Sequence, residues 1–415
     1  RQVTTDLPMA MGALLVGGEL TRYLSRRSPW RFLTLALALG FACAVKFSAL
    51  FLVPPLLLAM VWGATRGAAR YQGEAGIRSA GVLLRDFVAV CLITMLLVNA
   101  TYGFERTGFT VEKTLDHEPR PVNWIVRREG GELLEKVSFL PSLPAWMPVP
   151  LPYPYVYGLF TIKAQNDRGH GGWFLGERRT TGGHPLYFPI MILIKSPAAH
   201  LLLALAGLFF LRRRGEDPED PEPGGTRAAI VLIPLFYLLV LLGSGIQIGV
   251  RHAMPVLVFL PLFAGWAAAK LWERGRWGKG VTAGLLLLLV AEVLASHPRH
   301  ISHFSWLIGG REVGHRISIV GEDWGQDMRE LAALVRKEGL EPLHYQSFGA
   351  ASSAELRYHG VEPIRMRCGR VPEGGGWVAV HAAMALRANR PCLPMEKGRR
   401  PDKILNHHIW LYRLD

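Results

Sequence analysis

Basic side chains lie inside or at the ends of long apolar stretches of this chain. Lys195 lies deepest, roughly nine residues or about 13 Å of helix rise inside the run 186–211. Lys46, Arg251 and His252 follow the same pattern. A cation at such a depth costs a few kcal/mol unless it has an anionic partner or a wet cavity. Cations at helix ends can bind a phosphate and stabilise it as it leaves. The pattern predicts an anion site, provided that all four residues face one side of a membrane.

Each of these residues also has a plainer interpretation. Lys46 lies between two apolar runs, where its side chain could reach the nearby surface. Arg251 and His252 could anchor a helix at the membrane interface. A guanidinium is nonetheless better suited than an ammonium to form paired hydrogen bonds with a phosphate. Part of the run around Lys195 could extend out of the membrane. His200 is expected to be a packed or pairing residue.

Acidic residues lie where they could complete such a site. Asp6 begins the first apolar run and precedes Pro8, so it is either a helix N-cap or an active-site carboxylate that holds a divalent metal or orients a substrate. Both can hold, because a cap leaves one oxygen free. Glu177 and His184 flank Gly182-Gly183 just before the Lys195 run, which predicts either a flexible flap over a ligand or a solvated loop.

Composition and hydropathy indicate an α-helical polytopic membrane protein. Half of the 415 residues are hydrophobic, and they cluster in runs. A hydrocarbon core of about 30 Å needs about 20 helical residues, which predicts about eight spans. These runs are 7–24, 32–46, 47–63, 87–103, 186–211, 228–243, 253–271 and 280–296. The net charge of +14 does not indicate nucleic acid, because much of the excess lies in short loops between apolar runs.

The basic loops orient the chain. The loops near 22–31, 66–85, 212–227 and 270–279 are rich in Arg and Lys and fall on one side if the spans alternate. The positive-inside rule makes that side cytoplasmic. Asp6, Lys46, Arg251, the loop 104–185 and the tail are then extracytoplasmic, and the protein is a multi-pass protein of the inner (plasma) membrane.

The predicted organisation has four parts: transmembrane helices over 1–103, an extracytoplasmic loop with interfacial segments over 104–185, transmembrane helices over 186–296, and a small extracytoplasmic α/β domain over 297–415. Within the loop, 121–140 is expected to form an interfacial helix whose apolar side chains face lipid; these are Trp124, Ile125, Leu133, Leu134 and Val137. The segment 216–223 is acidic and proline-rich, which is typical of disorder.

In the tail, strands are expected near 316–320, 343–348, 377–382 and 408–413, and helices near 325–338 and 352–359. Asp323 and Gln326 have capping-box spacing at the first of these helices. Asp327 is expected on the helix surface, and Trp324 offers a face for sugar stacking.

The four cysteines show no C-x-x-C spacing and predict neither a zinc site nor a disulfide framework. Whether Cys368 and Cys392 pair stays open. The sequence begins at Arg1 without an initiator Met, charged n-region or cleavage site, so we expect that it lacks its true beginning.

Several segments together resemble one family. They are Thr4-Thr-Asp6-Leu-Pro8, Leu39-Gly-Phe-Ala-Cys-Ala-Val-Lys46-Phe-Ser-Ala-Leu, Gly172-Trp-Phe-Leu-Gly-Glu177, His184-Pro-Leu-Tyr-Phe-Pro-Ile-Met-Ile-Leu-Ile-Lys195-Ser-Pro197, Ile248-Gly-Val-Arg251-His252-Ala-Met-Pro255 and Glu322-Asp-Trp-Gly-Gln-Asp327. In order and coverage the chain resembles membrane glycosyltransferases of the GT-C fold, in the group of dolichyl-phosphate-mannose–protein mannosyltransferases and the lipid A aminoarabinose transferase.

The resemblance implies transfer of a sugar, with inversion, from a polyprenyl-phosphate carrier to a protein, lipid or envelope-glycan acceptor on the outer face. It implies that Asp6 belongs to the site. With such a donor, the charge and placement of Lys46, Lys195, Arg251 and His252 predict that they hold the donor phosphate. The family's catalytic base is expected upstream of Arg1. Two rivals stay open: a transporter or lipid flippase, which predicts repeated halves that are not seen, and a noncatalytic membrane scaffold.

Overall fold

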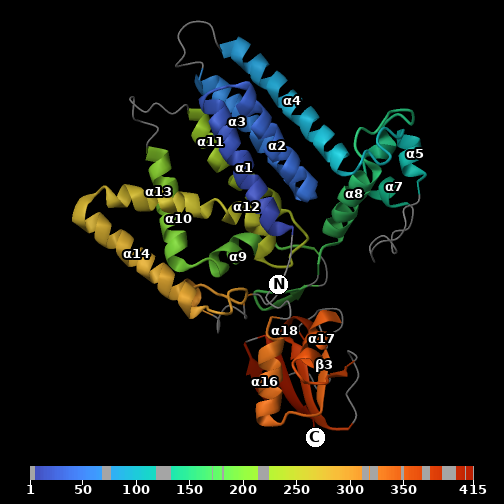
Figure 1. Cartoon of the computed structure of the whole chain (residues 1–415), viewed down its shortest axis with the longest axis vertical. Helices are drawn as coiled ribbons and strands as arrows, with labels where there is room; N and C mark the ends of the chain where they lie inside the picture. Colours follow the sequence, from blue (N-terminus) through green and yellow to red (C-terminus); the bar gives the residue numbers. More distant parts are fainter. Residues whose placement is uncertain are drawn as a thin grey trace.

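The computed structural model describes residues 5–67, 76–117, 132–170, 172–179, 182–213, 224–310, 317, 326–346, 350–366, 374–385, 399–406 and 408–414. The protein is mostly helical and carries a small mixed sheet (Figure 1). Its apolar helices are α1 (Asp6–Ser25), α2 (Pro29–Val45), η1 (Phe47–Leu52), α3 (Val53–Gly67), α4 (Gly76–Thr101), α9 (Tyr187–Lys195), α10 (Ala198–Arg213), α11 (Gly224–Leu242), η5 (Val250–Ala253), α12 (Met254–Leu257), α13 (Leu260–Trp272) and α14 (Gly275–Ala295).

A helix covers each of the predicted apolar runs, but fewer of these helices qualify as spans than the sequence predicts. Within the described residues, Gly81–Thr101 and Gly275–Ala295 are long and apolar enough to cross a membrane. Two bent pairs, α9 with α10 and η5–α12 with α13, raise this number to four if each pair is one span. Pro29–Val45, Phe47–Gly63 and Ala229–Leu242 are apolar but shorter. The chain thus has two to four candidate spans by length and composition, and the count of eight stays a prediction.

The run 186–211 is not one continuous helix. It forms α9 and α10, which meet at 117°. The break is at Ser196-Pro197, where proline supplies no N–H and disfavours helical geometry in the residue before it. Lys195 is therefore the last residue of α9 and lies at a helix end, not inside a straight span.

Close packing holds the apolar helices in two groups. In one, α1 packs against α2 and α11, and α4 packs against α2 and α3; in the other, α10 packs against α13 and α14 (Figure 1). Glycine allows the close approach: a Cβ on Gly12 would lie 2.8 Å from the Cβ of Ala42, and a Cβ on Gly207 would lie 1.9 Å from the carbonyl oxygen of Phe263. Small residues at such contacts are typical of helix packing in membranes.

The segment between α4 and α9 has a small core of its own. Its elements are α5 (Val111–Leu115), α7 (Leu133–Val137), η3 (Leu140–Ser142), α8 (Tyr153–Arg168) and the hairpin of β1 (Gly172–Phe174) and β2 (Glu177–Arg179). The prediction that Leu133 and Leu134 face lipid is wrong. They are 0% and 1% exposed and pack against residues of α8, because the short helix buries its apolar face within the loop itself. Trp124 and Ile125 lie outside the described residues.

The C-terminal part is an α/β unit with a five-stranded sheet. The strand order is β4-β3-β5-β7-β6; β3 runs parallel to β4 and β5, whereas β7 is antiparallel to β5 and β6. The elements are α16 (Met328–Glu338), β3 (Leu343–Gln346), α17 (Ala350–Tyr358), β4 (Ile364–Arg365), β5 (Gly376–His381), α18 (Ala382–Ala385), β6 (Lys403–Leu405) and β7 (Ile409–Leu414); η6 (Trp306–Ile308) lies before this unit, in the segment that follows α14. In Figure 1 this unit lies apart from the apolar helices, on the side toward which the N-terminal end of α1 points.

Most of the predicted strands and helices of the tail are confirmed, and two details are wrong: Asp327 is 2% exposed rather than on the helix surface, and the capping box does not form. The strands near 343–348, 377–382 and 408–413 and the two helices are present, while β4, β6 and α18 were not predicted. The helix begins at Met328 with Asp327 as its N-cap residue, so the Asp323–Gln326 capping box does not form its start. Asp323, Trp324, Cys368, Cys392, the acidic loop 216–223 and all but one residue of the strand near 316–320 lie outside the described residues.

Candidate functional site

Asp6, Lys46 and Arg251 meet at one end of the apolar helices. The Lys46 ammonium donates to one Asp6 oxygen at 2.5 Å, and Arg251 Nε lies 3.9 Å from the other. The Asp6 side chain is 8% exposed, against 21% for Lys46 and 28% for Arg251. The structure thus gathers three residues that are separated by up to 245 positions in the sequence around one buried carboxylate.

Each of these three side chains lies at or next to the end of a helix. Thr5 is the N-cap residue of α1, so the prediction that Asp6 is the cap is wrong. Asp6 is in the first turn, where the positive end of the helix dipole stabilises a carboxylate. Lys46 has extended backbone angles and separates α2 from η1. Arg251 lies in η5, which follows Gly249 with a φ of 111°, a conformation that favours glycine.

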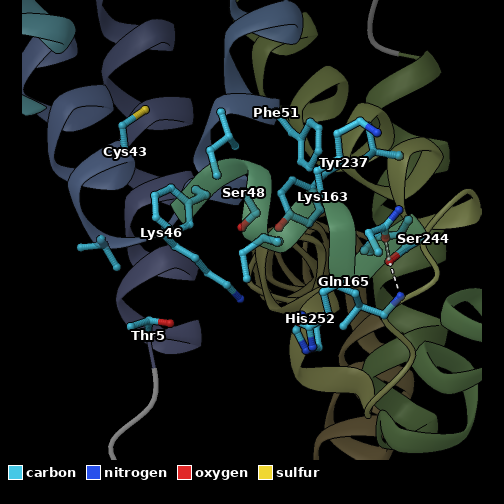
Figure 2. Close-up of a pocket in the computed structure, with 18 of the residues that line it drawn as sticks. Thr5, Cys43, Lys46, Ser48, Phe51, Lys163, Gln165, Tyr237, Ser244 and His252 are labelled. Carbon is cyan, nitrogen blue, oxygen red and sulfur yellow. Dashed lines mark hydrogen bonds between the residues drawn. The ribbon is translucent and has the colours of Figure 1, made fainter. Parts of the chain in front are cut away.

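A cavity of about 660 Å³ lies beside this cluster. Figure 2 shows Lys46 and His252 among the side chains around it. Its lining mixes apolar and polar side chains. The apolar ones include Phe47, Phe51, Leu159, Ile162, Val240 and Ile248, and the polar ones include Ser48, Tyr102, Tyr155, Gln165, Asn166 and Ser244. A cavity of this size and mixed character suits an amphipathic ligand.

Hydrogen bonds between α8 and the loop after α11 hold part of the cavity lining in place. The Asn166 side-chain oxygen accepts from the Gly245 N–H at 3.0 Å and from the Ser244 hydroxyl at 3.2 Å. A Cβ on Gly245 would lie 2.2 Å from the Asn166 carbonyl oxygen, so this approach requires glycine. The loop segment 104–185 therefore contributes directly to the cavity through α8.

Lys195 lies in a different environment from the other three predicted phosphate ligands. Its ammonium is 3.6 Å from the centre of the Phe304 ring, and it does not line the cavity. The Tyr187 hydroxyl of the same helix accepts from the Gly249 N–H at 2.9 Å and so joins α9 to the segment that carries Arg251. The structure thus brings Lys46, Arg251 and His252 together and leaves Lys195 in a neighbouring cluster.

Glu177 and His184 do not line the cavity. Glu177 is exposed at the start of β2, after a turn in which Leu175 and Gly176 have positive φ. His184 is held in an ordered turn: Gln247 accepts from its N–H at 2.9 Å and donates to its carbonyl at 2.8 Å. Its ring Nδ1 accepts from the Leu186 N–H at 3.1 Å. The flap itself stays a prediction.

Asp6 does not fit a divalent metal in this arrangement. Both of its oxygens face cationic groups, and a metal ion there would add two positive charges beside Lys46 and Arg251. Among the described residues, no three His, Cys, Asp or Glu side chains are grouped to hold a metal. One carboxylate and two cations leave a net positive charge, which favours an anion.

Sequence reasoning missed two buried polar clusters. Glu292, in the apolar run of α14, is 0% exposed. In the C-terminal unit, Asp327 pairs with His408 at 2.8 Å, and the Tyr345 hydroxyl hydrogen-bonds His381 at 2.6 Å. Burial, with a smaller effect of His408, lowers the pKa of His381 to about 3. The signal for this second cluster was faint: His381 and His408 stand at the ends of predicted strands.

Comparison with known proteins gave no match: no family model fits the chain, and no match was found among curated proteins or solved structures. The functional argument therefore depends on the motifs and on the geometry of the site.

Proposed function

We propose that this protein is a membrane glycosyltransferase that moves a sugar from a polyprenyl-phosphate carrier to a protein, lipid or envelope-glycan acceptor on the outer face of the plasma membrane. The observation that carries the proposal is the Asp6–Lys46–Arg251 cluster beside a cavity that is partly apolar and partly polar. Such a donor has a phosphodiester between a sugar and a prenyl chain, so it needs cations, polar groups and an apolar wall within one cavity.

The charges of the cluster suit the change in charge during transfer. A polyprenyl-phosphate sugar carries one negative charge, and the phosphate gains negative charge as the bond to the anomeric carbon breaks. Lys46 and Arg251 together exceed the charge of Asp6 by one, so the cluster can bind the donor and attract the leaving phosphate more strongly. His252 lines the same cavity, and an imidazole N–H can donate a further hydrogen bond.

In the proposed reaction, an acceptor hydroxyl oxygen attacks the anomeric carbon. The bond from that carbon to the phosphate oxygen breaks, and its electron pair stays on the phosphate. The hydroxyl proton passes to a carboxylate base, for which the family resemblance implies a residue other than Asp6. Asp6 itself has both oxygens facing cations, so its role is to hold Lys46 and Arg251 in position and to orient the acceptor.

Transfer assays with the full-length protein in lipid nanodiscs test this proposal. The protein is incubated with a panel of radiolabelled polyprenyl-phosphate sugars and with hydroxyl-bearing peptide and glycolipid acceptors. Asp6→Asn is expected to lower transfer at least 100-fold while the protein still enters the membrane. The double variant Lys46→Gln/Arg251→Gln is expected to weaken donor binding by about 100-fold or more, since each charge-assisted hydrogen bond contributes about 1.5–3 kcal/mol.

Arg106→Gln is the matched control, because Arg106 is a loop cation that pairs with Glu105 away from the cluster. It should leave donor binding unchanged. Near-normal turnover of Asp6→Asn, or unchanged donor binding by the double variant, would reject the assignment of this site. Donor binding without transfer to any acceptor would favour the scaffold.

A further inference from the structure

The buried carboxylate of Glu292 lies at the break between α9 and α10. It is on α14, a candidate span, and is 0% exposed. A carboxylate buried in apolar surroundings requires compensating hydrogen bonds or charges. The contacts of this carboxylate therefore indicate why an acidic residue is placed there.

Glu292 joins two segments that are distant in sequence. One oxygen accepts from the N–H of Ala198, the first residue of α10, at 2.8 Å. The other accepts from the N–H of Trp306 at 2.8 Å. The positive end of the dipole of this 16-residue helix also stabilises a carboxylate at its first turn. Glu292 thus caps α10 from outside and ties it to the connector 297–310, which links α14 to the C-terminal unit.

The connector in turn holds the end of α9. The Ser305 N–H donates to the carbonyl of Ile194 at 2.7 Å, and the ring of Phe304 lies under the Lys195 ammonium at 3.6 Å. Phe304 is 3% exposed and Ser305 is 0% exposed, so this contact is enclosed. A cation over an aromatic face gains more when water is excluded.

Histidine and serine side chains complete the enclosure. His303 Nε2 lies 3.6 Å from Glu292, and its Nδ1 is 2.7 Å from the Ser296 hydroxyl. Farther along the same connector, Arg299 pairs with Glu330 of α16 at 2.5 Å, and Glu330 also accepts from Asn406 at 2.7 Å. The connector is therefore fixed both to the apolar helices and to the C-terminal unit.

We infer that Glu292 is a positioning residue that fixes the connector 297–310 against the α9–α10 break and thereby holds Lys195 in place for the donor phosphate. The inference rests on the proposed function for its last step. Its first step, that Glu292 fixes the break, does not depend on activity. Lys195 lies at the end of α9 with its ammonium over the Phe304 ring, and the connector makes its position depend on the C-terminal unit.

Two measurements on the full chain in nanodiscs test the inference. Hydrogen–deuterium exchange is followed in peptides that cover 194–200 and 303–308, and donor binding is measured with a polyprenyl-phosphate sugar. Glu292→Gln replaces one accepting oxygen by an NH₂ group, so exchange in both peptides is expected to rise at least tenfold while α1 and α2 stay protected. Glu292→Gln should bind donor about as weakly as Lys195→Gln. The double variant Lys195→Gln/Glu292→Gln should bind donor no more weakly than either single variant.

Thr282→Val is the matched control. Thr282 is a buried polar residue of the same helix, and its hydroxyl donates to the carbonyl of Gly278 within that helix. It should change neither measurement. Phe304→Leu is a second variant that keeps Glu292 and an apolar side chain but removes the ring face under Lys195; it should weaken donor binding several-fold without faster exchange at 194–200.

Unchanged exchange in Glu292→Gln, or equally faster exchange throughout the chain, would overturn the positioning role. Additive losses of donor affinity in the double variant would overturn the link to Lys195. If the wild-type protein binds no polyprenyl phosphate, the proposed function and the last step of the inference fail together, and the exchange data still decide the first step.

Discussion

His381→Gln is expected to reduce the loss of stability that the C-terminal unit undergoes as the pH falls from 6.5 toward 3. His381 is 1% exposed, its Nε2 lies 2.6 Å from the Tyr345 hydroxyl, and its ring stacks on that of His408 at 6.5 Å. Burial, with a smaller effect of His408, lowers the pKa of His381 to about 3. The native protein thus holds this imidazole neutral at pH values where an exposed histidine takes up a proton.

The sign follows from proton uptake by the unfolded chain. Its histidine has a pKa of 6.5, so below that pH the unfolded state binds a proton that the native state excludes. The stability contribution is complete above pH 6.5 and declines as the pH falls toward 3. At pH 5 the loss is about 2 kcal/mol, and by pH 3 it reaches about 4 kcal/mol, from about 1.4 kcal/mol per pKa unit. The Asp327–His408 pair stays in the variant, so the comparison isolates His381.

Hydrogen exchange in β5 and β7 measures this effect at pH 7.5 and pH 5 after correction for the intrinsic exchange rate. The wild-type protein should lose protection by about 30-fold between the two pH values, which corresponds to about 2 kcal/mol. His381→Gln should lose much less, whatever its stability at pH 7.5. His359→Gln, at the end of α17 and outside the cluster, should behave as wild type. An equal loss of protection in wild type and His381→Gln would refute the reasoning.

Two packing predictions concern the helices and the loop. Gly207→Ala should lower the melting temperature by several degrees, because the added Cβ would overlap the Phe263 carbonyl oxygen. A Cβ on Gly265 meets nothing within 4 Å, so Gly265→Ala should be neutral or slightly stabilising. Equal stability of the two variants would contradict the α10–α13 packing. Leu133→Ala should destabilise the loop core by about 2–5 kcal/mol and speed proteolysis within 104–168. Lys136 is an exposed position on the same helix, so Lys136→Ala should change neither quantity. If Leu133 faced lipid instead, the two variants would be cleaved at the same rate.

The apolar helices and most of the C-terminal strands could be predicted because each has a local pattern. An apolar run needs no knowledge of its neighbours to be read as a helix, and alternation near 377–382 and 408–413 predicts β5 and β7 directly. The orientation of Leu133 and Leu134 could not be predicted, since an amphipathic helix has the same pattern whether it packs on lipid or on α8. The bend between α9 and α10 had a signal in Pro197 that a hydropathy average conceals.

The candidate site was only partly readable for the same reason. Asp6, Lys46 and Arg251 are conspicuous as charges beside apolar runs, but their mutual contacts depend on which helix ends meet. Glu292 was overlooked because a single carboxylate near the end of a run looks like an interface residue. Its partners are backbone N–H groups of Ala198 and Trp306, and any residue type supplies such groups. Sequence therefore shows charged side chains more readily than the backbone that satisfies them.

Helix ends supply a structural reason for part of the Asp6 cluster. Asp6 lies at the positive end of α1, and Lys46 follows the negative end of α2, so each charge is favoured by its own helix as well as by its partner. That explains one ion pair. It does not explain why Arg251 approaches the same carboxylate from η5, nor why Lys46 and His252 line a cavity that is also lined by apolar side chains. A purely structural pair needs one cation for one carboxylate, whereas the surplus positive charge and the adjoining cavity are what an anionic lipid donor requires.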